Sequence, residues 1–228
     1  MKGAGAQEVT IELDAGGQVS GLWQQAEGRA ATACLVLAHG AGAGMRHPFM
    51  AAVADGLAAR GIATLRYQFP YMERGSRRPD SPAVAHSAVR AAVSEARLLA
   101  PGLPLIAGGK SFGGRMTSQA QAAAPLAGVR GLVFLGFPLH PAGKPSTERA
   151  EHLLDVDIPM LFLQGTRDDL AQLDLLKPII ARLGARATLK VIDGADHSFH
   201  VLARSGRTDA EAREEMLRSI GGWADALL

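Results

Sequence analysis

The sequence predicts an α/β fold, in which helices cover both faces of a mostly parallel central sheet. Beyond residue 30, short continuous apolar runs alternate with longer alanine-rich segments of helical character. This is the pattern of strands that are buried on both faces and joined by crossover helices. Gly61 and Gly184 follow two of the helical segments, where helices commonly end. The length of 228 residues suits a single domain over residues 1–228.

The individual elements follow from these runs and their boundaries. Residues 9–13 and 19–23 alternate in hydropathy around Asp14-Ala15-Gly16-Gly17, which predicts a hairpin lying antiparallel at one sheet edge. The stretch 139–158 is the least regular and has room for at most one short helix, so we expect no substantial lid domain and an open site. The expected strands are 33–38, 62–68, 104–109, 131–137, 159–164 and 187–192, and the expected helices are 48–60, 81–99, 113–123, 169–183 and 208–227.

The composition is that of a globular protein and excludes several classes of partner. The 24 Lys and Arg residues nearly balance 22 Asp and Glu residues, which argues against binding to nucleic acid or to an anionic membrane. No apolar run approaches membrane-spanning length, and the first residues lack the apolar core of a signal peptide, so we expect a cytoplasmic protein. Cys34 lies in an apolar run and is interpreted as core packing. The oligomeric state is left open.

A candidate nucleophile lies at a predicted junction between a strand and a helix. The segment Gly109-Lys110-Ser111-Phe112-Gly113 matches G-x-S-x-G, follows an apolar run and precedes a helical segment. A sharp turn at this junction holds the serine in strained geometry, and glycines at the flanking positions avoid collisions with neighbouring backbone. The start of the following helix favours negative charge near Ser111.

A candidate acid and a candidate base follow two later strands. Asp168 comes after the run 159–164, and His197 comes after the run 187–192. The carboxyl ends of parallel strands meet at one edge of a sheet, so these side chains can converge with Ser111. The histidine would take the proton of the serine hydroxyl, and the aspartate would fix the imidazole tautomer.

Both assignments have a neighbouring competitor. Asp169 precedes Leu170 and is interpreted as the N-cap of helix 169–183, which leaves Asp168 as the acid. His200 lies three residues after His197, and we prefer His197 because it is nearer the strand end; His200 is then a partner in the first turn of a short helix. The remaining histidines have no companions at metal-ligand spacing, so neither a metal nor another cofactor is predicted.

Two backbone N–H groups are expected to stabilise an oxyanion at Ser111. One is that of Phe112, and the other comes from the glycine-rich loop 39–44, with Ala41 preferred over Gly42. This loop lacks the spacing of a dinucleotide fingerprint, and Arg66 rather than an acidic residue ends the next strand. The sequence Gly-Lys-Ser also imitates the end of a phosphate-binding loop, but Pro104 occupies the position where that motif needs glycine.

Several larger side chains have two open interpretations. Arg66 and Arg115 could bind an acidic substrate, although structural ion pairs beneath the site are favoured. Another set of residues on loops near the same sheet edge could line an acyl pocket or simply pack in the core. These residues are Met45, Phe69, Tyr71, Phe137 and Phe199.

Together, the segments around His39, Ser111, Asp168 and His197 resemble the α/β-hydrolase superfamily over nearly the whole chain. The stretches 65–73 and 113–116 are similar to a subgroup of small lid-less predicted hydrolases, which also resembles dienelactone hydrolases and includes a testis-expressed protein and part of a chromatin-complex subunit. The resemblance implies an eight-strand-type sheet and a Ser111, Asp168 and His197 triad. Ser111 stands where dienelactone hydrolase has cysteine, so the resemblance supplies no substrate.

The expected function is an esterase-type serine hydrolase that acts on a small acyl substrate through an acyl-enzyme. Ester, thioester and amide bonds are all compatible with this chemistry. The alternative is a binding or scaffolding protein that keeps the fold without turnover, because a fold alone does not establish function.

Overall fold

The computed structural model describes residues 5–14, 16–28 and 30–227. Its eight strands form one sheet in the order β1-β2-β4-β3-β5-β6-β7-β8. The β1/β2 and β2/β4 pairs are antiparallel, whereas the other neighbouring strands are parallel. The predicted edge hairpin and mostly parallel sheet are therefore confirmed. The strands are β1 (Gln7–Glu12), β2 (Gln18–Gln24), β3 (Ala33–Ala38), β4 (Ile62–Tyr67), β5 (Leu105–Lys110), β6 (Val129–Leu135), β7 (Met160–Gly165) and β8 (Ala187–Ile192).

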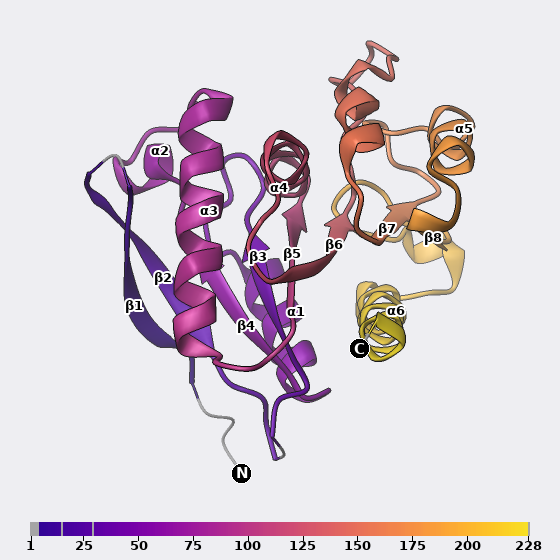
Figure 1. The fold of residues 1–228 in the computed structure, drawn as a ribbon. Coiled ribbons are helices and arrows are strands. Elements are labelled where there is room, and N and C mark those ends of the chain that lie inside the picture. Colours follow the sequence, from indigo (N-terminus) through magenta and orange to yellow (C-terminus); the bar gives the residue numbers. More distant parts are fainter. Residues whose placement is uncertain (1–4, 15, 29, 228) are drawn as a thin grey trace.

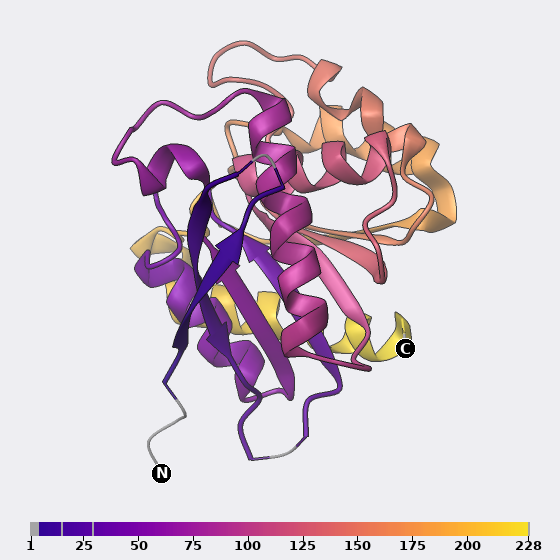
Figure 2. The same cartoon turned by 60° about the vertical axis from the view of Figure 1, so that its left-hand side comes forward.

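Helices cover both faces of this sheet, as Figures 1 and 2 show. Apolar residues of α3, α4 and α5 bury one face, and apolar residues of α1 and α6 bury the other. The central strands β3, β4 and β7 are buried along their whole length, which explains their continuous apolar sequences. The α-helices are α1 (Pro48–Ala58), α2 (Pro70–Glu73), α3 (Pro82–Leu99), α4 (Phe112–Ala123), α5 (Leu173–Leu183) and α6 (Asp209–Leu227).

Several details differ from the expectation, and three of them bear on the site. The strand expected at 131–137 spans 129–135 instead, and it ends at Leu135 because Gly136 turns the chain with a φ of 72°. The short helix α2 was not predicted. The helix expected at 169–183 begins only at Leu173, so residues 166–172 form a loop at the carboxyl end of β7.

The stretch between β6 and β7 contains the 3₁₀ helix η1 (Glu148–Asp155), in agreement with the expectation of at most one short helix. η1 contacts α4 and α5. Two further 3₁₀ turns are η2 (Gly184–Arg186), directly before β8, and η3 (Ala203–Ser205), between β8 and α6. Within the described ranges, no helix combines the length and the apolar character needed to cross a membrane.

Candidate active site

Ser111 occupies a strained position between β5 and α4. Its backbone has φ 50° and ψ −114°, in a region that non-glycine residues seldom adopt. The Ser111 N–H donates to the carbonyl of Leu135 at 3.2 Å, which ties the turn to the neighbouring strand β6. Such strain costs on the order of 1–3 kcal/mol and persists only where the surroundings impose it. The turn therefore holds the serine at the carboxyl edge of the sheet.

The glycines around Ser111 are required by close backbone contacts. A Cβ on Gly109 would lie 2.2 Å from the carbonyl oxygen of Ala38, and one on Gly113 would lie 2.6 Å from that of His39. Both distances are far below van der Waals contact, and the obstructing atoms belong to backbone that cannot easily move. The G-x-S-x-G spacing thus has a steric cause at this junction.

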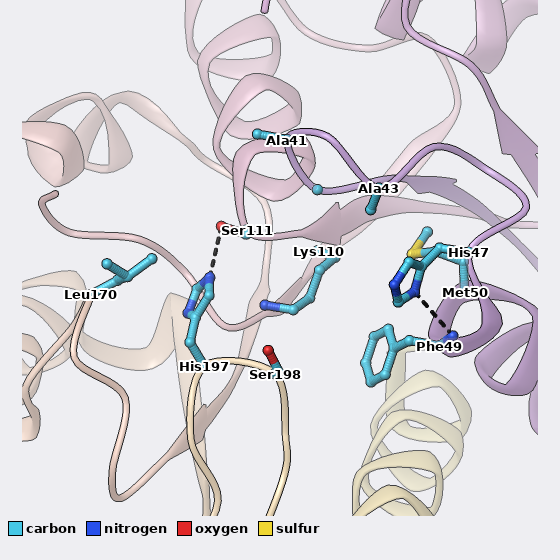
Figure 3. A pocket seen from close by; sticks show the side chains of 11 residues that line it. Ala41, Ala43, His47, Phe49, Met50, Lys110, Ser111, Leu170, His197 and Ser198 are labelled. Carbon is cyan, nitrogen blue, oxygen red and sulfur yellow. Dashed lines mark hydrogen bonds between the residues drawn. The ribbon is translucent and has the colours of Figure 1, made fainter. Parts of the chain in front are cut away.

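His197 joins Ser111 to Asp168. Its Nε2 lies 2.8 Å from Ser111 Oγ, and its Nδ1 lies 2.7 Å from Asp168 Oδ2 (Figure 3 shows the contact with Ser111). Nδ1 faces a carboxylate and therefore carries the proton, which leaves Nε2 to accept the serine hydroxyl proton. The structure thus brings together the three side chains that the sequence selected.

The Asp168 side chain is fully buried and its oxygens are well supplied with donors. Oδ1 accepts the backbone N–H of Leu170 at 2.8 Å, and Oδ2 accepts the side-chain amide of Gln164 as well as the histidine. The other end of the Gln164 amide accepts the backbone N–H of Phe137 at 3.0 Å. The contact between Gln164 and Asp168 was not predicted. The sequence signal that could have indicated it is the presence of a polar residue near the end of an otherwise apolar strand.

The two alternative candidates, Asp169 and His200, lie outside the hydrogen-bonded group of Ser111, His197 and Asp168. The prediction that Asp169 caps a helix was wrong, because α5 starts after Gln172 and the Asp169 side chain is exposed. His200 does not lie in a short helix; it is exposed, and its Nδ1 lies 3.0 Å from Asp209 at the start of α6. Hydrogen bonding to Asp209 raises the pKa of His200.

The loop after β3 presents Ala41 beside the serine. The carbonyl of Gly40 accepts hydrogen bonds from His39 Nδ1 at 2.8 Å and from the N–H of Ala43 at 3.3 Å. Because the carbonyl and N–H of a trans peptide point in opposite directions, the Ala41 N–H points away from these donors. None of the described residues accepts it, whereas the Gly42 N–H donates to the Tyr71 hydroxyl at 3.2 Å. This geometry favours Ala41 over Gly42.

The second expected donor, the Phe112 N–H, belongs to the first residue of α4. The first N–H groups of a helix have no intrahelical acceptor, so it is available to a ligand. A Cβ on Gly40 would lie 3.9 Å from Ser111 Cβ, which places the loop after β3 directly against the start of α4. The two N–H groups therefore flank the serine from two different elements.

His39, which holds this loop, is a buried neutral imidazole. Its Nε2 accepts the N–H of Phe69 at 3.1 Å, so Nδ1 carries the proton that is donated to Gly40. Burial lowers the pKa of His39 to about 4, and the hydrogen bond to Gly40 only partly opposes this. A protonated His39 could no longer accept from Phe69.

This lowered pKa predicts acid sensitivity. The unfolded chain binds a proton at His39 below its ordinary pKa of 6.5, but the folded protein does so only near 4, so stability present above pH 6.5 is lost as the pH falls toward 4. The loss attributable to His39 is on the order of 3 kcal/mol. Urea unfolding at pH 7 and 4.5 should show a smaller loss in His39→Asn than in the wild type. Equal losses would contradict this assignment.

A cavity of about 360 Å³ opens beside the serine (Figure 3). Of the residues selected from the sequence, Ala41, Ser111 and His197 line it. The residues considered for an acyl pocket are buried in the core instead: Met45, Phe69, Tyr71, Phe137 and Phe199. Apolar lining comes from Phe49 and Met50 at the start of α1 and from Leu170.

Arg66 and Arg115 do not form the predicted ion pairs within the described ranges, nor do they line the cavity. Arg66 is buried and donates to the side-chain oxygen of Gln24 at 3.2 Å. Arg115 lies 6.0 Å from the ring of Phe112. Among the described residues, no group of three or more His, Cys, Asp or Glu side chains is placed to hold a metal ion.

A strained serine between a parallel strand and a helix, with histidine and aspartate on loops after later strands, defines the α/β-hydrolase class. The chain belongs to the alpha/beta hydrolase domain family, whose sequence model matches residues 31–225.

Solved structures share this fold at low sequence identity. An alpha-beta serine hydrolase homologue from Coxiella burnetii is 20% identical, with a TM-score of 0.76 over 93% of this chain and 96% of that one. A serine hydrolase without a lid from Xanthomonas campestris is 19% identical, with a TM-score of 0.76 over 96% and 95%. A dienelactone hydrolase from Anabaena variabilis is 21% identical, with a TM-score of 0.77 over 96% and 97%.

Proposed function

We propose that this protein is a serine esterase that hydrolyses small acyl substrates through a covalent acyl-enzyme. The observation that carries the proposal is the continuous chain of hydrogen bonds from Ser111 through His197 to Asp168, at 2.8 Å and 2.7 Å. A serine hydroxyl is a weak nucleophile until a base removes its proton, and this chain supplies that base.

The first half-reaction forms the acyl-enzyme. Ser111 Oγ attacks the acyl carbon while His197 Nε2 takes its proton, and Asp168 stabilises the resulting imidazolium. The N–H groups of Phe112 and Ala41 donate to the oxyanion of the tetrahedral intermediate. His197 then gives its proton to the leaving alkoxide, and the alcohol departs. In the second half-reaction, His197 activates water in the same way, and the acid is released.

The structure also favours a small substrate. The cavity of about 360 Å³ lies at the low end of the range for ligand sites, and its apolar lining from Phe49, Met50 and Leu170 suits a short carbon chain. The stretch after β6 folds against α4 and α5 as η1, so access to the serine does not require a large lid to move.

Active-site labelling tests the proposal directly. A fluorophosphonate should form an adduct on Ser111 in the native protein, identified by peptide mass spectrometry, and Ser111→Ala should lose both the adduct and 4-nitrophenyl acetate turnover. Ser198→Ala is a matched control, because Ser198 also lines the cavity but follows the histidine and forms no side-chain hydrogen bond to it. Absence of an adduct, with equal turnover in Ser111→Ala, would instead indicate a non-catalytic binding or scaffolding protein.

A further inference from the structure

Lys110 is a charged residue in the candidate active site to which the proposed ester hydrolysis gives no role. It is the last residue of β5 and directly precedes Ser111. It lines the same cavity as the serine, and Figure 3 shows its amino end on the side of His197 and Ser198. A Cβ on Gly136 would lie 3.2 Å from Lys110 Nζ and 3.3 Å from His197 Nδ1, so the amino group is near the imidazole.

The amino group is buried and lacks a hydrogen-bond partner. Lys110 Nζ has no acceptor among the described residues. The ring of Phe199 also lies near it, with its centroid 5.7 Å from Nζ. A buried ammonium has three donors, and leaving them unpaired costs free energy that a bound acceptor would recover. A bound anion would therefore stabilise the buried ammonium group of Lys110.

The two nearby carboxylates form no hydrogen bond with Lys110 Nζ. Asp168 is already bonded to His197, Gln164 and the Leu170 N–H. Asp196 Oδ1 accepts the backbone N–H groups of Ser198 and His200. The charges of both aspartates still oppose the effect of burial, which lowers the pKa of Lys110 to about 8. At pH 7 the group is therefore mostly an ammonium ion.

A second donor lies on another wall of the cavity. His47 Nδ1 accepts the N–H of Phe49 at 3.2 Å and so caps α1. The proton of the neutral imidazole is then on Nε2, on an exposed side chain that lines the cavity. No Asp or Glu residue is among those that line this cavity, and the two nearby aspartates, Asp168 and Asp196, lie behind its walls.

From these observations we propose that the natural substrate is an ester that also carries a carboxylate, and that Lys110 Nζ binds this carboxylate. The inference rests on the proposed function and specifies its substrate class. Lys110 lines the cavity while its Nζ is covered, so the proposal requires a rotation about the terminal bonds of this flexible side chain to bring the ammonium to the ligand. Phe49 and Met50 contact the carbon chain that links the ester to the carboxylate.

Matched pairs of esters test this inference. One pair carries the charge on the acyl side: mono-4-nitrophenyl adipate and its methyl ester. The other carries it on the leaving group: 4-acetoxybenzoate and its methyl ester. The readout is the ratio of kcat/KM for the anionic ester to that for the neutral one, divided by the same ratio for hydroxide-catalysed hydrolysis. We expect this ratio to exceed one for at least one pair, which then identifies the side that carries the carboxylate.

Variants assign the preference to Lys110. The ratio should fall roughly 10- to 100-fold in Lys110→Met, the loss expected for one hydrogen bond between charged groups. Lys110→Arg should retain part of the preference, and Lys190→Met should keep the wild-type ratio because Lys190 is an exposed lysine on β8. If Lys110→Met does not fold, the wild-type ratio should still decline between pH 7 and 9.5 as the ammonium loses its proton.

The outcomes separate this inference from the proposed function. A wild-type ratio near one for both pairs, or an unchanged ratio in Lys110→Met, would overturn the carboxylate assignment while Ser111 still forms its fluorophosphonate adduct. If the proposed function fails, neither ester is hydrolysed and no adduct forms. Binding can still be measured in Ser111→Ala: monomethyl adipate should raise the melting temperature of this variant but not of the Ser111→Ala, Lys110→Met double variant. Equal shifts in the two proteins would contradict a carboxylate site at Lys110.

Discussion

Replacing His197 with alanine is expected to lower kcat for 4-nitrophenyl acetate on the order of 10⁶-fold, because the proposed base and nucleophile act as one unit. His197 Nε2 lies 2.8 Å from Ser111 Oγ, and in the structure no other imidazole contacts that oxygen among the described residues. Without the imidazole, the serine proton has no acceptor when the tetrahedral intermediate forms. The remaining activity would come from the oxyanion donors and from binding alone.

His200→Ala is the matched control for this experiment. His200 lies three residues away, is exposed, and contacts Asp209 rather than the serine. We expect its loss to leave kcat within a few-fold of wild type. Circular dichroism and thermal melting of both variants would establish that each is folded. If activity survives in His197→Ala and disappears in His200→Ala, the assignment of the base is wrong.

For Asp168→Asn we expect kcat to fall about 10⁴-fold, the loss that a wrong imidazole tautomer produces in a triad of this type. The carboxylate accepts from His197, from the Leu170 N–H and from the Gln164 amide, and all three are donors. An asparagine has one acceptor oxygen and adds donors of its own, so it cannot satisfy this set. The imidazole would then present its proton toward Ser111.

Fluorophosphonate labelling of Asp168→Asn should become slower in parallel with the loss of kcat. Asp169→Asn supplies the comparison, since it makes the same chemical change at the adjacent, exposed position. Its rate should stay close to that of wild type. If the labelling rate fell strongly in Asp169→Asn and only slightly in Asp168→Asn, the acid would be Asp169 and not Asp168.

The architecture could be predicted because its signals are local. Continuous apolar runs such as Leu35-Val36-Leu37 are characteristic of strands covered on both faces, and the structure buries all three residues. The strand and helix before and after Ser111 were likewise visible in the sequence, and the glycine contacts with Ala38 and His39 explain why the pentapeptide is so restricted.

Other features depend on contacts between distant segments and could not be predicted. Residues 169–172 were predicted to be helical, because nothing local indicates that the Asp168 carboxylate is held by His197, which follows β8, and also accepts the Leu170 N–H. For Phe69 and Tyr71 the sequence left pocket lining and core packing open, and the structure shows that they turn inward and pack against His39. The isolated Lys110 ammonium was also invisible, since only the fold shows which acceptors are absent around it.

The hydrogen bonds of Gln164 determine which nearby positions can change without moving Asp168. Because this amide joins Asp168 to the Phe137 N–H, Asp168 is held by β7 and by the chain just after β6 instead of depending only on the loop that follows it. Leu170 contributes only its backbone N–H to Asp168, while its side chain lines the cavity beside Ser111 (Figure 3). Substitutions at position 170 can therefore reshape the cavity without shifting the acid, which makes this loop a natural place for selection or engineering to alter substrate preference.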